Sequence, residues 1–426
     1  MITTPIHYDE FYDQLWKECL SWENYGFEKI VFIEDIEGKL KFLIWADNNE
    51  IVNKVKEQLK NIDKNSVFFK GEIWQSKTKG TSNADKEFYE SIWEEAQPIG
   101  KSEKIRYLTR VRNRGSWFQN VEPVWEVKDN PKILVFYSFK GGVGRTTSLA
   151  ATALDLAKRN KKVVVVDADL DAPGIGILLP PDPRFDKPGL GIMDYLIESN
   201  NTTDYPLKDY YHEFVPKNGE NIILFPSALI NSNYLAKLSR LDMEPEGKDF
   251  PLKKFLEEIK SNLNPDYILI DGRAGLADSS GVLLNGFAHL YILFGTVSEQ
   301  SWNGLELVIE RLGNQRIKEG KKQANCILVQ TMLPEVIESH KIVSERFRTR
   351  ASGIYETNYY YSENDRDKGW SAADKNNPDS PHHQIPISYS VKLATFRDIK
   401  DIEKDLVQSS EYIELFHRIA GRFGEK

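Results

Sequence analysis

The sequence has few cysteines, no excess of positive charge and no long apolar run. Its 426 residues include only two cysteines, Cys19 and Cys326, which lie far apart and outside any metal-binding spacing. This excludes a disulfide scaffold and fits a reducing compartment. The net charge of −8 excludes the overall positive field that many nucleic-acid-binding proteins carry. No apolar run approaches the roughly 18 residues of a membrane-spanning helix, and the N-terminus lacks the basic and apolar regions of a signal peptide. We therefore expect a soluble, cytoplasmic protein that does not act at a membrane.

The composition is that of a folded protein with more than one domain. Hydrophobic residues make up 40% of the chain and aromatic residues 12%, and the length allows roughly two or three domains of ordinary size. We predict a small α/β domain over residues 1–122, a linker over 123–131 and a second domain over 132–426. Hydrophobic periodicity in the first domain predicts helices near 11–20, 48–61 and 84–96 and strands at 29–34, 40–45, 66–74 and 105–111.

A basic run near the end of the first domain leaves two interpretations open. It leads into the aromatic residues Trp117 and Phe118 and consists of Lys101, Lys104, Arg106, Arg110, Arg112 and Arg114. Basic and aromatic side chains together suit single-stranded nucleic acid or a phosphorylated partner. A solvated strand edge is favoured over both, because lysine and arginine commonly protect edges from aggregation.

Residues 132–147 are the stretch around which the second domain is organised. An apolar strand at 133–137 is followed by Lys140-Gly141-Gly142-Val143-Gly144 and by a helix that starts at Arg145. This order makes a phosphate cradle, because glycines let backbone N–H groups point inward and the first helical turn has free N–H groups. The common pattern G-x-x-x-x-G-K-[ST] fails twice, with Phe139 at the first glycine and Arg145 at the lysine. On this stretch alone, a turn that merely closes a βα unit stays an alternative.

The rest of the second domain alternates buried strands with helices. Such alternation predicts a mainly parallel, doubly wound α/β sheet with helices on both faces, in which ligands bind at the C-terminal ends of the strands. The further strands are predicted at 163–166, 222–225, 267–270, 290–294 and 326–329, and the helices near 149–159, 232–240, 249–263, 299–315 and 334–350.

Three acidic residues stand at or just past two of these strand ends. Asp167 and Asp169 follow Val166, and Asp271 follows Ile270. A carboxylate at the tip of a buried strand is costly to hold without a partner. With a bound triphosphate that partner would be Mg²⁺, which takes one or two carboxylates plus phosphate oxygens.

These motifs together resemble a known family. Residues 139–147 resemble the deviant Walker A loop, K-G-G-x-G-K-[ST]-[ST], of the ParA/MinD family of P-loop ATPases, which belong to the SIMIBI class. Residues 163–174 resemble its next strand with the D-x-D segment, and 266–271 resemble its Walker B strand. The sequel Ala274-Gly275-Leu276 and the serine-containing helix start at 299–304 also match. The resemblance covers about residues 131–426 and implies a P-loop fold there.

The resemblance implies a role for each matched position. Lys140 would reach across a nucleotide-bridged homodimer to the phosphates bound by the second copy. Asp169 would orient the attacking water, and Asp271 would hold Mg²⁺ through water with Asp167 nearby. The ATP-binding loop would comprise Gly141, Gly142, Val143, Gly144, Arg145, Thr146 and Thr147, with Thr146 at the metal and Thr147 at the α-phosphate. Such a site catalyses phosphoryl transfer to water by positioning and charge neutralisation.

Three positions depart from the family pattern. Arg145 replaces the lysine that lies along the β- and γ-phosphates, and its planar fork makes this exchange non-conservative. We therefore expect nucleotide binding with slow hydrolysis. Arg273 stands where the family has proline, and we expect it to contact phosphate or to pair with Asp271. Gln330-Thr331 replaces the base-recognising Asn-Arg, so adenine specificity is an expectation from the family alone.

From the resemblance we expect an ATP-dependent switch whose N-terminal domain couples the cycle to a protein partner. A degenerate loop that binds nucleotide without hydrolysis stays an alternative. Phosphotransfer to tyrosines in the run 355–361 is a third hypothesis, although that run is better explained as an insertion loop containing a strand. The apolar stripe Tyr412, Leu415, Phe416, Ile419 and Phe423 is expected to pack on the sheet rather than to bind a membrane.

Overall fold

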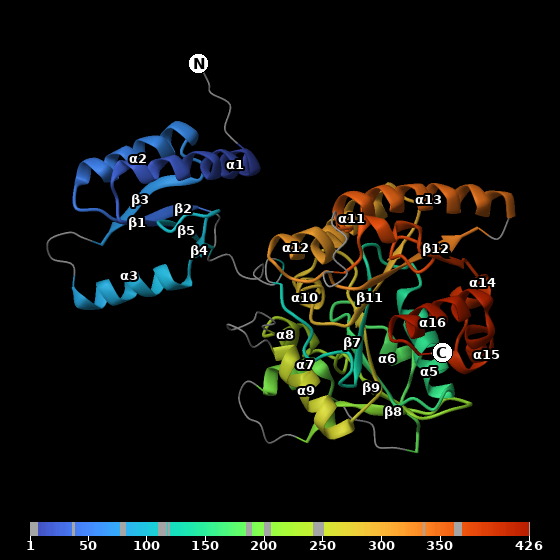
Figure 1. The fold of residues 1–426 in the computed structure, drawn as a ribbon. Helices are drawn as coiled ribbons and strands as arrows, with labels where there is room; N and C mark the ends of the chain where they lie inside the picture. Colours follow the sequence, from blue (N-terminus) through green and yellow to red (C-terminus); the bar gives the residue numbers. More distant parts are fainter. Residues whose placement is uncertain are drawn as a thin grey trace. The chain divides into compact units, whose positions relative to one another are not determined.

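The chain folds into two compact units, residues 1–113 and 114–426 (Figure 1). The computed structural model describes residues 7–35, 39–76, 82–109, 117, 120–184, 190–199, 206–241, 251–334, 337–361 and 369–425. Within these ranges, no helix is long and apolar enough to cross a membrane.

The first unit is built on a five-stranded mixed sheet with the order β3-β2-β1-β5-β4. β1 pairs with β2 antiparallel and with β5 parallel, and β2 pairs with β3 parallel. The strands are β1 (Lys29–Glu34), β2 (Leu40–Trp45), β3 (Phe69–Gln75), β4 (Gln97–Pro98) and β5 (Ile105–Thr109).

Helices cover both faces of this sheet (Figure 1). Ile30 and Phe32 of β1 pack in the core beneath α1 (Tyr8–Cys19) and α2 (Asn49–Ile62), whereas Val31 and Ile33 face α3 (Asn83–Glu95). Alternate residues of a strand point to opposite faces, so a strand buried on both sides is apolar throughout. The 3₁₀ helix η1 (Leu20–Tyr25) follows α1.

Part of the basic run has a structural role in the first unit. Arg106 donates a hydrogen bond from Nη1 to the carbonyl oxygen of Trp93 at 2.8 Å, and its guanidinium lies 4.2 Å from the centre of the Trp93 ring. It thereby satisfies an otherwise free carbonyl near the C-terminus of α3. Lys101 and Lys104 are exposed, and Arg110, Arg112 and Arg114 lie outside the described residues.

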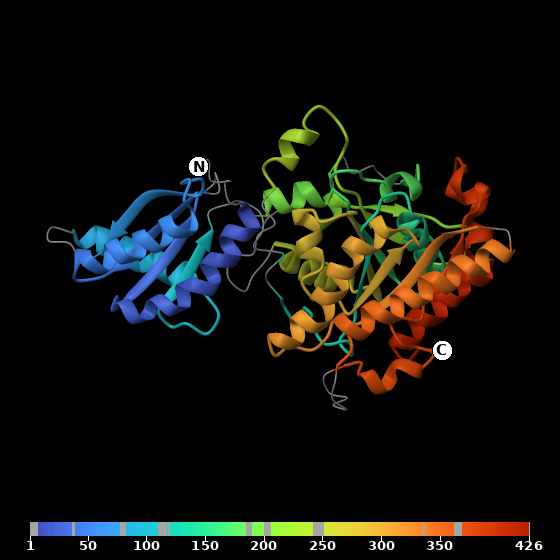
Figure 2. The ribbon, with the colours of Figure 1, turned by 90° about the horizontal axis from the view of Figure 1, so that it is seen from above.

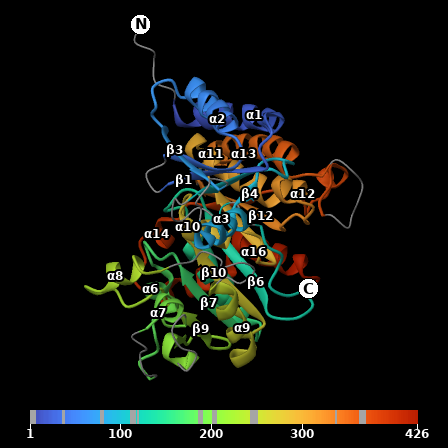
Figure 3. The ribbon, with the colours of Figure 1, turned by 90° about the vertical axis from the view of Figure 1, so that its left-hand side faces the viewer.

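The second unit contains an eight-stranded sheet with the order β13-β12-β11-β6-β10-β7-β9-β8. All neighbours pair parallel except β8, which is antiparallel to β9. Figure 3 shows β6, β10, β7 and β9 side by side in this order. The strands are β6 (Lys132–Ser138), β7 (Val163–Ala168), β8 (His212–Phe214), β9 (Ile222–Phe225), β10 (Tyr267–Gly272), β11 (Leu290–Gly295), β12 (Cys326–Leu333) and β13 (Ile385–Ser388).

Helices lie on both faces of this sheet, as Figure 2 shows from above. One core is formed with α7 (Ile192–Glu198), α9 (Pro251–Leu263), α11 (Glu299–Glu310) and α13 (Ile337–Asn358), and the other with α5 (Arg145–Lys158), α15 (Ile399–Gln408) and α16 (Ser410–Arg422). The predicted doubly wound, mainly parallel α/β sheet is therefore confirmed. Shorter segments are α6 (Ile175–Leu178), η2 (Leu207–Tyr210), α8 (Tyr234–Leu238), α10 (Asp278–Leu283), the π-helical η3 (Arg311–Gln315), α12 (Arg316–Lys318), η5 (Ala372–Asn376) and α14 (Val391–Ala394).

Two predictions for the C-terminal half have different outcomes. The apolar stripe of α16 packs in the core, with Leu415 fully buried and Phe416 4% exposed, as expected. The insertion loop predicted at residues 355–361 is wrong for its first half, because Tyr355 lies in α13, which continues to Asn358. Tyr355 and Tyr359 are fully buried and Tyr360 is nearly so. Apolar packing of these rings extends the helix, and buried hydroxyls are poor acceptors for a transferred phosphoryl group.

Residues 120–131, which include the predicted linker at 123–131, are hydrogen-bonded to the second unit. The Val121 and Val124 amides donate to the carbonyl oxygens of Asn285 and Phe287. The His289 ring accepts from the Ile133 amide at 2.8 Å and bonds the Trp125 carbonyl oxygen at 2.8 Å. These bonds place the division between the compact units before this segment, at residue 113.

Candidate functional site

The turn between β6 and α5 has the backbone that a phosphate cradle requires. Gly142 and Gly144 have φ angles of 71° and 79°, in the left-handed region that favours glycine. A Cβ atom on either would meet no other atom within 4 Å, so the backbone angle rather than crowding requires glycine. No side chain caps the N-terminus of α5, a helix of 14 residues. Its first N–H groups therefore face the turn, where an anion is stabilised.

Phe139 fixes the beginning of this turn against a neighbouring helix. A Cβ atom added to Gly304 of α11 would lie only 2.0 Å from the Phe139 ring, so the ring lies directly on the helix backbone. Phe139, which stands at the first glycine of the common pattern, therefore has a packing role. The surface on which it packs is the start of α11, the serine-containing helix start noted in the sequence.

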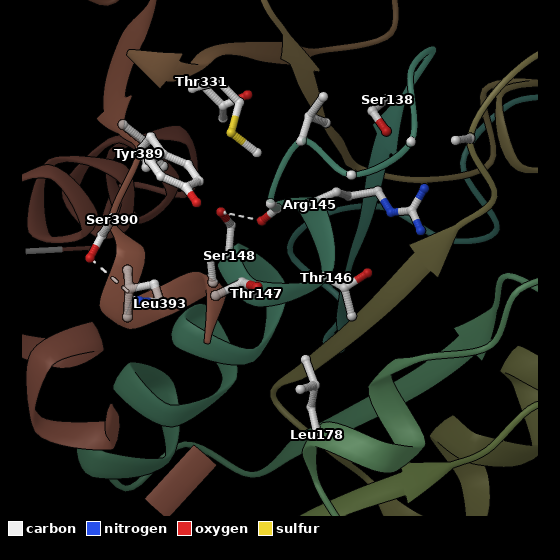
Figure 4. Close-up of a pocket in the computed structure, with 18 of the residues that line it drawn as sticks. Ser138, Arg145, Thr146, Thr147, Ser148, Leu178, Thr331, Tyr389, Ser390 and Leu393 are labelled. Atoms are coloured by element: carbon white, nitrogen blue, oxygen red, sulfur yellow. Dashed lines mark hydrogen bonds between the residues drawn. The ribbon is translucent and has the colours of Figure 1, made fainter. Parts of the chain in front are cut away.

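The turn opens into a pocket of about 680 Å³ at the C-terminal edge of the sheet. One end is lined by residues 141–148 together with Asp169, Asp171 and Arg273. The other end is lined by apolar and hydroxyl side chains of the last residues of β12 and β13 and of the segment that follows β13, and Figure 4 shows Tyr389 pointing into the space beside Ser148. The lining residues at this end include Thr331, Met332, Ser388, Tyr389, Ser390, Leu393 and Phe396.

The three acidic residues lie at or just past the C-terminal ends of β7 and β10, and Asp169 among them lines the pocket. β7 and β10 are neighbours, and Asp167 pairs in register with Asp271. Asp167 is 1% exposed, Asp169 is 6% exposed and Asp271 is fully buried. Burial, followed by the nearby charges of Asp271 and Asp169, raises the pKa of Asp167 well above its usual range. Its Oδ1 atom is buried without a hydrogen-bond partner among the described residues.

Arg145 is ion-paired with two of these acids. Its Nε donates to Asp271 Oδ1 and its Nη2 donates to Asp169 Oδ2, each at 2.7 Å. The arginine is only 8% exposed. Burial opposes its charge, but the carboxylates of Asp271 and Asp169 outweigh burial and raise the pKa of Arg145 above its ordinary value. The residue at the position of the family's lysine thus points at the acids.

Thr146 completes the bonding of Asp271. Its Oγ1 donates to Asp271 Oδ2 at 2.7 Å, so both oxygens of this carboxylate accept hydrogen bonds. Burial raises the pKa of Asp271, and the Arg145 charge and the Thr146 hydroxyl counter part of that rise. Asp169 Oδ1 also accepts from the Ala172 amide at 3.3 Å.

The remaining site residues are spread along the pocket's rim. Lys140 is exposed, and Thr147 is half-buried on the pocket wall. The expected pair between Arg273 and Asp271 is wrong: Arg273 Nη1 bonds Asp171 Oδ2, and both oxygens of the fully buried Asp271 already accept from Arg145 and Thr146. Thr331 lines the pocket, whereas Gln330 is fully buried and bonds the Val343 carbonyl oxygen.

The oxygen atoms at this site are of the kind that binds Mg²⁺. Thr146 Oγ1, the Asp271 carboxylate and the unpartnered oxygen of Asp167 are all hard oxygen donors next to the phosphate cradle. Thr146 and Asp271 would hold the ion, which would neutralise phosphate charge. Arg145 must leave Asp271 for that oxygen to face the metal or its water.

The second unit is similar in sequence to known proteins. Residues 131–323 match a family model described as an AAA domain. An ATP-binding protein of Methanocaldococcus jannaschii is 25% identical over 240 residues, which are 53% of this chain and 82% of that protein. The septum site-determining protein MinD of Helicobacter pylori is 23% identical over 213 residues, or 50% of this chain and 71% of MinD. A solved plasmid partition protein from Borrelia burgdorferi has a TM-score of 0.41 and 20% identity, covering 68% of this chain and 99% of that one.

The second unit is a ParA/MinD-like P-loop domain. The matched residues begin one position before β6 and include the glycine turn and all three acids. The predicted resemblance therefore holds for the segment that carries the glycine turn and the acids, while residues 1–130 lie outside the matched family model.

The far end of the pocket in this ParA/MinD-like domain was missed by the sequence prediction. Tyr389 and Phe396 follow β13, a four-residue strand whose sequence, Ile-Pro-Ile-Ser, is too short to identify from periodicity. Tyr389 is 43% exposed and Val391 59% exposed in the structure.

Proposed function

We propose that the chain is a nucleotide-dependent switch that binds ATP with Mg²⁺. The observation that carries this proposal is the shared pocket: the glycine turn, the N-terminus of α5 and the buried Asp169 line one end of a cavity large enough for a nucleotide. The backbone N–H groups of residues 141–144 and of the first turn of α5 would hold the β-phosphate. Thr147 would contact the α-phosphate, while Thr146 and Asp271 would hold the metal.

The base would lie at the far end of the pocket. Tyr389 and Phe396 offer aromatic surfaces there, and Met332 and Leu393 offer apolar contacts. A flat ring gains free energy by stacking on an aromatic side chain without reading its hydrogen-bonding edge. Adenine specificity remains an expectation from the family.

Hydrolysis in this site is proposed to be slow. Asp169 would orient the attacking water, but its Oδ2 atom bonds Arg145. Arginine keeps the positive charge of the usual lysine with a different shape and bidentate preference. Charge neutralisation is therefore retained, whereas the geometry for in-line attack differs from that of a lysine loop.

The switch is proposed to act through a homodimer and a protein partner. Exposed Lys140 would reach the nucleotide bound by the second copy, and the first unit would couple the nucleotide state to a partner that is positioned or regulated. The cell-division and plasmid-partition relatives support a positioning role. The first unit's exposed Lys101 and Lys104 leave nucleic acid as a possible but not favoured partner.

Phosphate release and light scattering with ATP and Mg²⁺ test this switch. We expect a dimer with ATP, a monomer with ADP and slow phosphate release that increases in Arg145→Lys. Phosphate release at the same rate from the wild type and Arg145→Lys would contradict the assigned effect of Arg145. Binding without turnover or dimerisation would contradict the switch.

That second outcome would favour the alternative, a P-loop domain that binds nucleotide as a structural or regulatory ligand. The ion pairs of Arg145 with Asp169 and Asp271 are the observation in its favour, since they engage the groups that hydrolysis requires.

A further inference from the structure

Arg145 cannot hold the acids and the phosphates with the same hydrogen-bond donors. Nε and Nη2 each bond a carboxylate oxygen at 2.7 Å. Arg145 is the first residue of α5, and a phosphate that accepts from Nε or from the Nη2 hydrogen bonded to Asp169 must draw the side chain away from a carboxylate. Those two donors therefore serve either the acids or the phosphate.

The acid-bound arrangement is strongly favoured when no anion is present. Asp271 is fully buried and Asp169 is 6% exposed, so each needs a partner for its charge. Thr146 gives Asp271 one neutral hydrogen bond, and the nearest other acid, Asp167, adds repulsion rather than compensation. Arg145 supplies the cation for this wall of the pocket.

We infer that Asp169 is an affinity-setting residue, which holds Arg145 on the acids until a nucleotide phosphate draws it away. This inference rests on the proposed nucleotide binding and adds a role for Asp169 as a positioning residue. Releasing Arg145 frees Asp271 Oδ1 to face the metal or its water. Nucleotide binding therefore prepares the metal site, and the broken ion pairs reduce the affinity for nucleotide.

The side-chain Nε–H signal of Arg145 tests the movement directly. In full-length protein labelled with ¹⁵N-arginine, the signal is assigned by its loss in Arg145→Lys. Without nucleotide we expect it to be observable and protected from exchange, because the group is buried and bonded to Asp271. Saturating ADP should shift it. A signal that is unprotected without nucleotide, or unchanged at saturating ADP, would overturn the inference.

Calorimetry with ADP in EDTA tests the role of Asp169. Asp169→Asn keeps the side-chain shape and removes the charge that holds Arg145, so we expect ADP to bind about fivefold to tenfold more tightly. The matched control is Asp155→Asn, which removes the carboxylate of another ion pair on α5, outside the pocket, and leaves both bonds of Arg145 intact. Its affinity should change by less than about twofold on the same scale.

The outcomes separate the inference from the proposed function. ADP binding with no gain in Asp169→Asn, or with an equal gain in both variants, would overturn the inference and leave nucleotide binding established. No binding of ADP or ATP to the wild type would instead overturn the proposed function and the inference that rests on it.

Discussion

At the scale of single residues, Arg145 is the centre of the site. It joins two buried carboxylates at 2.7 Å, and removing one partner of a buried charge network leaves the other charges uncompensated. The same residue marks the chain's main departure from the family loop. Its substitution therefore affects both folding and nucleotide chemistry.

We predict that Arg145→Ala destabilises the nucleotide-free protein by about 3–5 kcal/mol, because Asp271 and Asp169 lose their cation. Urea unfolding of the second unit, followed by tryptophan fluorescence, measures this. Lys140→Ala is the control from the same loop: its side chain is exposed, and its effect should stay within about 0.5 kcal/mol. Equal stabilities of Arg145→Ala and the wild type would contradict the buried network.

Tyr389 provides a second test at this scale. Tyr389→Ala should weaken ADP binding about fivefold to tenfold through lost stacking, while Tyr389→Phe should bind like the wild type. Pyrophosphate serves as the internal control, since it reaches only the phosphate end and should bind all three proteins equally. Unchanged ADP affinity in Tyr389→Ala would place the base elsewhere.

At the scale of elements, the turn depends on the helix beside it. The Phe139 ring lies on the backbone of α11 at Gly304. We predict that Gly304→Ala displaces Phe139 and the start of the turn, because the new methyl group would lie within 2.0 Å of the ring. ADP affinity should fall at least about tenfold, a loss of roughly 1.4 kcal/mol.

Gly353→Ala is a control on helix α13, where an added Cβ atom meets nothing within 4 Å. It should keep the affinity of the wild type and gain a little stability from the better helix former. Normal ADP binding by Gly304→Ala would contradict the packing role assigned to Phe139.

The segment 120–131 is held to the second unit by hydrogen bonds of His289, so the stability of the fold depends on pH. Burial lowers the pKa of His289, whose ring accepts from the Ile133 amide in its neutral form. The unfolded chain therefore takes up a proton near the ordinary pKa of about 6.5, while the folded chain stays neutral to lower pH. The stability that neutral His289 contributes is therefore present above this pKa and decreases as the pH falls below it.

Unfolding free energies at pH 7.5 and 5.5 check this prediction. His289→Gln should be less stable than the wild type at pH 7.5 and show a smaller loss on acidification. His382, whose pKa burial lowers to about 4, contributes to the same acid loss in both proteins. An identical pH dependence for the wild type and His289→Gln would contradict the role of His289.

At the scale of the whole molecule, the strand pattern of both units could be predicted from the sequence. Apolar runs such as 163–166 are buried on both faces, and this leaves few alternatives to a parallel sheet. The proximity of Asp167 and Asp271 could also be predicted from the sequence, because the C-terminal ends of parallel strands lie at the same edge of a sheet.

Other features depend on packing that no local pattern encodes. The pairing of Arg145 with Asp169 and Asp271 depends on the direction in which the Arg145 side chain points, whereas the sequence shows only where Arg145 stands in the loop. The far end of the pocket depends on β13, a short strand that pairs with β12 although a long connection separates the two in the sequence. The continuation of α13 to Asn358 depends on the burial of Tyr355, although tyrosine-rich sequence favours strands locally.

The central claim is that the second unit binds nucleotide at the glycine turn. Calorimetric titration of the full chain with ADP and Mg²⁺ tests it most directly, with Gly144→Val as the paired variant because valine disfavours the φ of 79° at that position. We expect saturable binding at one nucleotide per chain for the wild type and its loss in Gly144→Val. No binding to the wild type, or equal binding to both proteins, would contradict it.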